Sequence, residues 1–358
     1  MSGIAFYAPL KSPNHPIPSG EREMARNLIR ALSSRGYDVE LSSEFRSLEK
    51  KGHLDAQTLL MAQAETEISA LKTRRDWSAW VTYHSYYKAP DLLGPALSKA
   101  LNIPYFVIEA TRASKRLGGP WDGFEKAAVR VCETADVLFH VTQRDAVALR
   151  PHIRSDQSLM HLAPFLDIEC LPAISQGPRD PVILIVGMMR EGDKLASYEI
   201  AADVLHTLEY GQWRVEIAGD GPARAKVENL MAPFGERISF LGALDKQTLQ
   251  LAYRRARALL WPGMNEAFGM VYLEAQAQGV PVVAENRSGV SDVVASDGLF
   301  AIGEHAVLAQ DLKRLLNDNE YHARRTQVAR EKIQAHHLLG AARDTLWGAM
   351  ARYLPEVA

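Results

Sequence analysis

The sequence predicts an α/β fold with two doubly wound domains, each a parallel sheet covered by helices on both faces. Short apolar segments of strand length alternate with amphipathic segments of helix length, which is the pattern of a parallel sheet. The alternation restarts at Val182, after Leu171–Pro181, a linker with three prolines and a glycine. The 358 residues also suffice for two domains of about 150 residues each. We therefore expect one domain at residues 1–170, a second at 181–338 and a C-terminal segment at 339–358.

The first domain opens with a strand, a Pro- and Gly-rich loop and an amphipathic helix. The helix expected at Glu21–Arg35 has an apolar stripe and an arginine stripe. Such a helix can lie on a membrane, but a helix packed on a sheet has the same pattern, and we favour packing. The strands of this domain are expected at Ile4–Ala8, Val39–Leu41, Trp80–Tyr83, Tyr105–Glu109 and Val137–Val141, and its further helices at His53–Arg74, Asp91–Leu101, Asp122–Thr134 and Arg144–Leu149.

The second domain repeats this alternation and ends in a separate helix. Doubly wound sheets bind ligands outside the carboxyl ends of their strands, so two such domains predict a site in a crevice between them. The tail helix is expected at Ala341–Leu354. The strands are expected at Val182–Val186, Val215–Ala218, Ile238–Leu241, Ala258–Trp261, Val280–Ala284 and Leu299–Ile302, and the helices at Leu195–Leu208, Ala223–Met231, Lys246–Arg257 and Gly269–Gln278.

Composition excludes several classes of protein. The chain is 47% apolar and 23% charged with a net charge of −2, so no basic surface for nucleic acid is indicated. Its start lacks the features of a signal peptide, and its longest apolar run, Val182–Met189, is far shorter than the ~20 residues of a membrane span. Cys132 and Cys170 have no metal-binding spacing and are expected to be thiols in a reducing compartment. We expect a cytoplasmic protein and leave open a peripheral contact with the inner face of a membrane.

The stretch Asn265–Pro281 holds two glutamates around a helix start. Glu266 is expected in the loop, and Glu274 in the helix that begins near Gly269, so both carboxylates can face one ligand. The free amides of Ala267, Phe268 and Gly269 suit phosphate. Carboxylates for hydroxyl groups beside amides for phosphate predict a sugar-nucleotide site. In the alternative, Glu274 is solvated and Glu266 is only a first-turn acid favoured by the helix dipole.

These residues also support a family resemblance. Glu266-Ala-Phe-Gly-Met-Val-Tyr-Leu-Glu274-Ala, followed by Gly279-Val-Pro-Val-Val-Ala284, resembles the two-glutamate motif of glycosyltransferase family 4. The resemblance covers the second half well and the first half in outline. It implies the GT-B fold, with two Rossmann-like domains facing across a crevice and a tail helix that returns to the first domain. It further implies a retaining enzyme that uses nucleotide-sugar donors and no cofactor.

Further donor-site residues follow from the resemblance. Gly219-Asp220 follows a strand and is similar to the family's turn at the nucleotide, and Gly289 lies where the family has a loop close to the donor. Lys194 matches the lysine that neutralises the departing pyrophosphate. The family's arginine position holds Met188, so Arg190 is offered as its substitute; the alternative for this segment is a solvated charged loop.

The first domain is expected to face the acceptor. Gly20 opens a helix and resembles the family's N-terminal glycine loop. His84 ends a strand at the crevice, with a purely structural role equally open, and Glu109 stands near the position where the family often has a histidine. Aromatic and basic residues of the same half could meet sugar rings and an anionic acceptor group, or could be ordinary surface. They are Tyr83, Tyr86, Tyr87, Lys88, Arg112, Lys115, Arg116 and Trp121.

The sequence thus predicts a metal-independent, retaining hexosyltransferase that moves a sugar from a nucleotide-diphosphate sugar to an acceptor hydroxyl of a glycan, lipid-linked or small molecule. No metal is expected, because no DxD-type acidic cluster lies at a strand end. Two alternatives remain: a GT-B sugar-nucleotide epimerase, and a non-catalytic sugar-nucleotide-binding protein, which the missing arginine at Met188 and missing histidine near Ala110 suggest. Sequence fixes neither the sugar, the base, the acceptor nor the oligomeric state.

Overall fold

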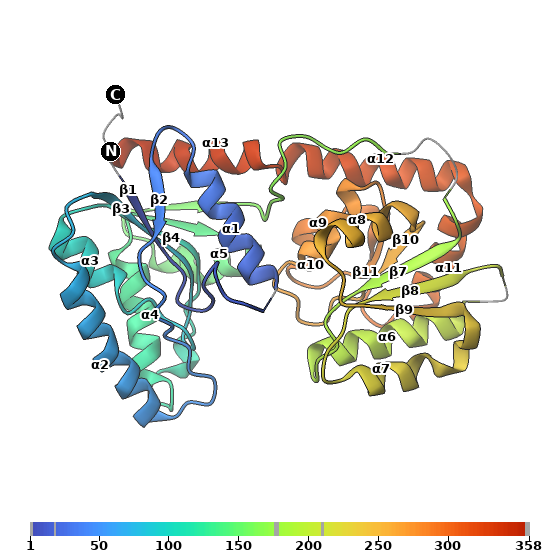
Figure 1. The fold of residues 1–358 in the computed structure, drawn as a ribbon, viewed down its shortest axis with the longest axis horizontal. Helices are drawn as coiled ribbons and strands as arrows, with labels where there is room; N and C mark the ends of the chain where they lie inside the picture. The colour runs from blue at the N-terminus through green and yellow to red at the C-terminus, as the bar shows by residue number, and fades with distance from the viewer. Residues whose placement is uncertain (1–2, 18, 175–178, 209–210, 355–358) are drawn as a thin grey trace. The chain divides into compact units, whose positions relative to one another are not determined.

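A computed structural model describes residues 3–17, 19–174, 179–208 and 211–354 (Figure 1). The chain divides into two compact units, Met1–Asp167 with Leu339–Ala358 and Ile168–Leu338. The first boundary thus falls three residues before the expected end at residue 170. Residues 175–178 of the expected linker lie outside the described part.

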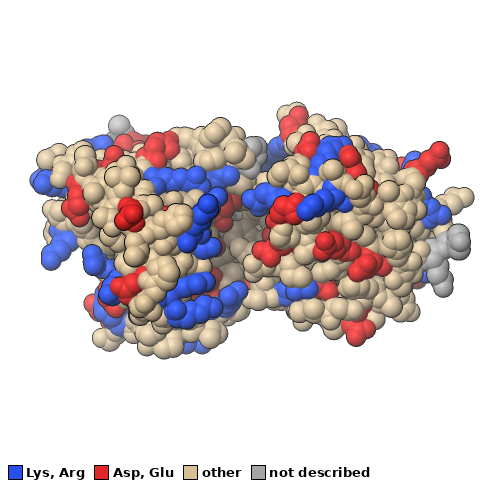
Figure 2. Space-filling view, turned by 90° about the horizontal axis from the view of Figure 1, so that it is seen from below, with Lys and Arg blue, Asp and Glu red and all other residues tan. Residues whose placement is uncertain are grey.

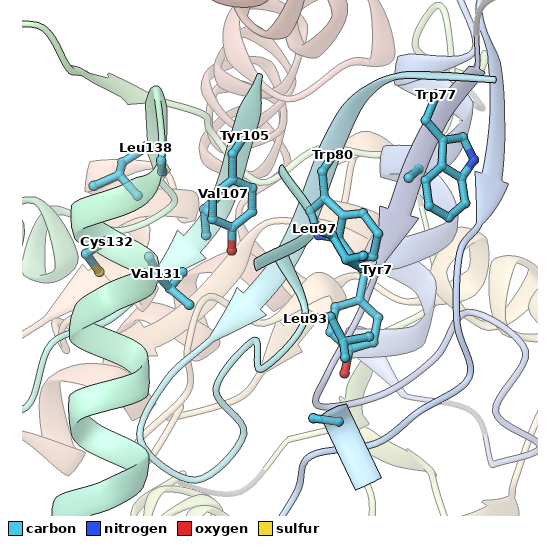
Figure 3. Packing of buried hydrophobic residues seen from close by; sticks show 14 of the residues in the cluster. Tyr7, Trp77, Trp80, Leu93, Leu97, Tyr105, Val107, Val131, Cys132 and Leu138 are labelled. Carbon is cyan, nitrogen blue, oxygen red and sulfur yellow. The ribbon is translucent and has the colours of Figure 1, made fainter. Parts of the chain in front are cut away.

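Unit 1 is built on a parallel sheet that, in the described residues, has six strands in the order β2-β1-β3-β4-β5-β6. Its core contains an aromatic group in which Tyr7, Trp77 and Trp80 pack together (Figure 3). The strands are β1 (Gly3–Tyr7), β2 (Asp38–Leu41), β3 (Trp77–Ser85), β4 (Tyr105–Ala110), β5 (Val137–His140) and β6 (Ser158–His161). The helices are α1 (Gly20–Leu32), α2 (Leu54–Leu71), α3 (Gly94–Leu101), α4 (Asp122–Thr134), α5 (Gln143–Leu149) and α13 (Leu339–Met350), with short 3-10 turns at Ser114–Arg116, Arg150–His152 and Ala351–Tyr353.

Helix α1 packs on this sheet with its apolar stripe, as the favoured interpretation of its sequence holds. Leu28 and Leu32 are fully buried. The arginine stripe is used within the unit, because Arg26 donates to the carbonyl of Pro13 and Arg30 pairs with Asp167. Helix α13 packs against α1 and β6, and the Trp347 indole donates to the carbonyl of Ala31 at 3.3 Å.

Unit 2 contains a second parallel sheet, with six described strands in the order β12-β11-β10-β7-β8-β9. Its central strand β7 is buried at all five positions, which explains its continuous apolar sequence. The strands are β7 (Val182–Val186), β8 (Arg214–Ala218), β9 (Ile238–Gly242), β10 (Ala258–Leu260), β11 (Val282–Glu285) and β12 (Leu299–Phe300). The helices are α6 (Asp193–Thr207), α7 (Arg224–Met231), α8 (Lys246–Arg255), α9 (Met270–Ala277), α10 (Val290–Val293), α11 (His305–Asn317) and α12 (Asn319–His336), with 3-10 turns at Ala232–Arg237 and Ser296–Gly298.

Several expected boundaries were wrong for identifiable reasons. Helix α1 ends at Leu32 rather than Arg35, because Arg35 has a φ of 69° and leaves the helical path. Helix α3 begins at Gly94, since the buried carboxylate of Asp91 caps its first amides. The tail helix runs from Leu339 to Met350 instead of Ala341–Leu354.

Four elements escaped sequence reasoning altogether, among them the four-residue helix α10. Strand β6 has four residues and lies half-exposed at the edge of its sheet. Helices α11 and α12 continue the alternation after β12, and α12 buries few of its 18 residues. Its remaining positions are mostly charged or polar, which hides the helical period.

Candidate active site

The two-glutamate motif connects β10 to α9 at the carboxyl edge of the unit 2 sheet. Gly269, with a φ of 73°, is the residue before the helix, and α9 begins at Met270. The helix start expected near Gly269 is thus correct to within one residue, and Ala267 and Phe268 lie in the turn that precedes the helix. The positive φ at Gly269 keeps this residue outside the right-handed helical path, so the helix begins at the next residue.

Glu266 accepts two hydrogen bonds inside unit 2. Its carboxylate pairs with the ammonium of Lys194 in the first turn of α6. The indole of Trp261 donates to the same carboxylate oxygen at 2.9 Å. The Lys194 ammonium also lies 5.4 Å from the centre of the Trp261 ring. The side chains of Glu266 and Lys194 retain 12% and 22% of their exposure, so this pair is accessible to a ligand.

Glu274 is half-buried in α9 and is not simply solvated. Its carboxylate accepts a hydrogen bond of 2.9 Å from the hydroxyl of Tyr253 in α8. Burial and the nearby Glu274 carboxylate raise the pKa of the Tyr253 hydroxyl, which therefore stays a hydrogen-bond donor. This contact orients Glu274 and leaves part of its carboxylate exposed.

Glycines allow the loops at this edge to approach one another closely. A Cβ added to Gly219 would lie 1.9 Å from the carbonyl oxygen of Gly187, and one on Gly289 would lie 2.0 Å from that of Ala267. The turn at Gly219–Asp220 is joined to the loop after β7, because the Met189 amide donates to the carbonyl of Asp220 at 3.0 Å. The Asp220 side chain itself is exposed and pairs with Arg224 at 3.4 Å. Four of the segments singled out in the sequence therefore meet at one edge of the sheet.

The two proposed cations differ in their surroundings. Lys194 belongs to the ion pair with Glu266, whereas Arg190 lies exposed in the loop after β7. Its main-chain amide donates to the carbonyl of Met188 at 3.1 Å, and no ion pair of its side chain is found among the described residues. Met188, at the family's arginine position, is half-buried.

In unit 1, His84 and Glu109 come together at the carboxyl ends of β3 and β4. The Nδ1 atom of His84 lies 3.8 Å from the Glu109 carboxylate and 2.9 Å from that of Glu21, in the first turn of α1. Gly20 is exposed and is the first residue of that helix, after the N-cap Ser19. Gly20, His84 and Glu109 thus belong to one neighbourhood, which includes a second carboxylate, Glu21, that the sequence did not indicate.

The electrostatics of this neighbourhood are dominated by burial and mutual charge. Burial opposes the charged imidazole, but Glu109 and Glu21 outweigh it and raise the pKa of His84 to about 10. Burial also raises the pKa of the Glu109 carboxyl, against the attraction of His84. The pKa of Glu21 shifts in the opposite direction. Burial acts to raise the pKa of this more exposed carboxyl, but His84 holds it below its ordinary value.

Several of the aromatic and basic residues singled out in unit 1 lie together around Tyr87. The guanidinium of Arg116 lies 4.8 Å from the centre of the Tyr87 ring, and the ammonium of Lys88 lies 5.7 Å from it. Tyr87 also packs edge-on against Trp121. Figure 2 shows basic side chains gathered on unit 1, at the left, while acidic ones are more prominent on unit 2.

Among the described residues, none of the helices has the length and apolar character needed to span a bilayer.

Known proteins resemble this chain in both sequence and fold. The family model described as glycosyl transferases group 1 matches residues 175–332. A D-inositol 3-phosphate glycosyltransferase of Corynebacterium efficiens is 29% identical over 316 residues, which are 80% of this chain and 72% of that protein. Together these likenesses support a GT4-type glycosyltransferase. The sulfoquinovosyl transferase of Arabidopsis thaliana is 27% identical over 54% of this chain but only 35% of its own length.

Solved structures confirm the expected fold of this glycosyltransferase. The sucrose-phosphate synthase of Thermosynechococcus elongatus aligns over 98% of both chains with a TM-score of 0.75 at 17% identity. The Anabaena HepE protein, solved with UDP and glucose, aligns over 97% of this chain and 99% of its own with a TM-score of 0.69 at 16% identity. The two parallel sheets are thus the two Rossmann-like domains of a GT-B fold. Transfer of a sugar is its activity, and no comparison supports the epimerase alternative.

Three residues of this glycosyltransferase that contact the candidate site were missed in its sequence. Trp261 and Tyr253 bind the two motif glutamates, but each is fully or almost fully buried and has the sequence context of an ordinary core aromatic. Glu21 was expected only as the first residue of the helix Glu21–Arg35. No local signal marked these roles, because each depends on a partner more than four residues away.

Proposed function

We propose that this glycosyltransferase takes its sugar from a nucleotide-diphosphate sugar and transfers it with retention of anomeric configuration. The observation that supports this best is the contact of Glu266 with Lys194 and Trp261 beside the start of α9. It combines a carboxylate suited to sugar hydroxyls, a cation suited to phosphate and the main-chain amides at a helix start. The HepE structure with UDP and glucose is consistent with a GT-B fold that accepts such a ligand.

Each donor group then has a proposed partner. Glu266 holds hydroxyl groups of the donor sugar, and Glu274, oriented by Tyr253, holds the ribose hydroxyls. Gly219, Asp220, Gly289 and the segment Ala267–Gly269 let the main chain approach the nucleotide and its phosphates. These roles are those that the family motif implies, and they depend on the proposed class of donor.

Departure of the pyrophosphate is the step at which charge grows. Lys194 and Arg190 stabilise that charge together with the amides before α9, so we propose that no metal ion is needed at the donor phosphates. No protein nucleophile is proposed, and the leaving phosphate accepts the proton of the acceptor hydroxyl. On the acceptor side, Gly20, His84 and Glu109 line the approach of that hydroxyl in unit 1.

The deciding experiment follows the anomeric proton. The full-length chain is incubated with a panel of nucleotide sugars and candidate acceptors, and the initial product is read by proton NMR. We expect one donor to yield a glycoside with the donor's own configuration and one equivalent of nucleoside diphosphate. An inverted product would contradict retention. Tight binding of a nucleotide sugar with neither transfer nor slow hydrolysis would favour the non-catalytic binding protein. Cell fractionation tests the predicted cytoplasmic location and any membrane contact.

A further inference from the structure

We propose that Glu21, His84 and Glu109 of unit 1 form a binding site for a divalent transition-metal ion, with Zn²⁺ as the best-matched ion. The site differs from the donor site in unit 2, where we propose no metal. It does not rest on the proposed transfer reaction, because metal binding is measured without any donor or acceptor. Each of the three residues offers one ligand atom, and these atoms lie within 4.8 Å of one another.

The backbone brings the ligands together in an unusual way. Strands β3 and β4 pair in register, with Tyr83 opposite Ile108 and Ser85 opposite Ala110, so His84 and Glu109 occupy matching positions. Both have left-handed φ values, 61° and 60°, which are rare for residues other than glycine. Such strain is kept where the surroundings fix it, and here it occurs at equal positions of two neighbouring strands.

The distances fit tetrahedral coordination. Zinc binds imidazole nitrogen and carboxylate oxygen at about 2.0–2.2 Å, which places tetrahedral ligand atoms ~3.3 Å apart. The separation of His84 Nδ1 from Glu21 is 2.9 Å, and that from Glu109 is 3.8 Å, so the two values lie on either side of this spacing. Small side-chain movements would accommodate the ion. One imidazole with two carboxylates suits Zn²⁺ better than Ca²⁺ or Mg²⁺, which prefer oxygen alone.

Two buried polar groups at the site make no hydrogen bond of ordinary geometry among the described residues, although burial raises the pKa of the Tyr83 hydroxyl and Glu21 and Glu109 lie close enough to raise it further. One is the Oε2 atom of Glu109, a residue that is 4% exposed, and the other is the hydroxyl of Tyr83, which is 1% exposed. A buried polar atom without a partner is costly, and most have one. The other oxygen of Glu109, Oε1, lies 3.8 Å from His84 Nδ1, and an ion bound by this carboxylate would compensate its buried charge. Three protein ligands leave one tetrahedral position open to water or a substrate oxygen.

Metal binding is measured with the ion itself. The full-length chain is freed of metal with a chelator and titrated with Zn²⁺ by calorimetry at one fixed pH, in a Cys170→Ser background because Cys170 is an exposed thiol. We expect one saturable site. Glu109→Gln and Glu21→Gln should each weaken binding more than ~100-fold, beyond the effect of losing an outer-sphere partner. His84→Asn should do the same, and asparagine tolerates the positive φ at this position.

Matched controls separate this site from adventitious binding. His161 stacks on His140 elsewhere in unit 1 and is exposed, and Glu65 is an exposed carboxylate of α2. His161→Asn and Glu65→Gln should leave Zn²⁺ affinity unchanged. Absence of a saturable site, or equal affinity in Glu109→Gln and the wild type, would overturn the proposal. If a ligand variant does not fold, Co²⁺ added to the wild-type chain decides: intense visible absorption bands of a tetrahedral site support the proposal, and their absence refutes it.

Discussion

The carboxyl edges of the two sheets are built in different ways. In unit 2 the site residues belong to short continuous segments, Gly187–Lys194 and Glu266–Glu274, and glycines permit the close contacts between loops. In unit 1 the polar cluster is assembled from α1, β3 and β4, and its strained positions are His84 and Glu109 rather than glycines.

The two sites therefore depend on different features of the structure. The unit 2 site relies on main-chain geometry, so its glycines and helix start are as important as its charges. The unit 1 cluster relies on side chains from distant segments, and its charges are only partly compensated, as the unpartnered oxygen of Glu109 shows. Substitutions should therefore separate into donor defects from unit 2 and acceptor or metal defects from unit 1.

The largest expected effect is the loss of turnover when Lys194, the cation of the unit 2 site, is replaced. Lys194→Ala should lower kcat by about 10²–10³, the range seen when one preorganised group that stabilises developing charge is removed. KM for the donor should change less, because the helix-start amides still bind the ground-state phosphates. Steady-state kinetics with one donor and acceptor measure both constants. A kcat within threefold of wild type would remove Lys194 from the proposed chemistry.

Arg190 provides the matched comparison for that lysine. If it stabilises the same charge, Arg190→Ala should also lower kcat, and the double variant with Lys194→Ala should lose less than the two single effects combined. Full activity of Arg190→Ala would mean that its exposed guanidinium is only solvated.

Glu266→Gln should have the next largest effect, a fall in kcat of roughly 10–100-fold. Affinity for the nucleoside diphosphate should stay near normal, because the proposed partner of Glu266 is the donor sugar, which that ligand lacks. Loss of a hydrogen bond to a charged group is worth about 1.5–3 kcal/mol, which corresponds to that range. Glutamine keeps the acceptor for Trp261, so the loop should remain in place. Calorimetry with nucleoside diphosphate and initial-rate assays provide the two readouts, and unaltered turnover would leave Glu266 as a helix-start acid.

Glu274→Ala should instead weaken the nucleoside diphosphate and the intact donor alike. The expected loss is again about 1.5–3 kcal/mol of binding free energy, because the ribose is common to both ligands. Tyr253→Phe is the control: it removes only the orienting hydroxyl and should cost less than Glu274→Ala. Unchanged nucleotide affinity of Glu274→Ala in calorimetry would refute the ribose role.

The close approach of loops in unit 2 is tested by two glycines with similar backbones. Gly289 has a φ of 87° and Gly303 one of 85°, but a Cβ on Gly289 would meet the Ala267 carbonyl, whereas one on Gly303 would meet nothing within 4 Å. Gly289→Ala should therefore lower the free energy of unfolding by about 1–3 kcal/mol more than Gly303→Ala. Thermal denaturation measures the difference, and equal melting temperatures would show that the loop relaxes freely.

The smallest effect on transfer is expected from Glu109→Gln, a substitution in the unit 1 cluster. The affinity for nucleoside diphosphate should stay within twofold of wild type, while the rate with acceptor falls about fivefold through lost contacts worth ~1 kcal/mol. Calorimetry and acceptor-dependent kinetics, run side by side, check both statements. A donor-binding defect as large as that of Glu274→Ala would contradict the assignment of separate roles.

Much of this was determined by the sequence alone. The alternation of strands and helices predicted two doubly wound domains, because burial on both faces of a parallel sheet imposes continuous apolar strands such as Val182–Val186. The two-glutamate motif identified the family for the same local reason: its residues are neighbours in the chain, and their spacing is set by one turn and one short helix.

Only the tertiary structure decided the contacts between distant segments. The sequence contained no sign that Glu21 would meet His84 and Glu109, since α1 and two strands converge there through packing of the whole sheet. It likewise could not show that Lys194 pairs with Glu266 or that Tyr253 binds Glu274. Local patterns fix periodicity and turns, whereas side-chain partners across 20 or more residues depend on how the elements pack.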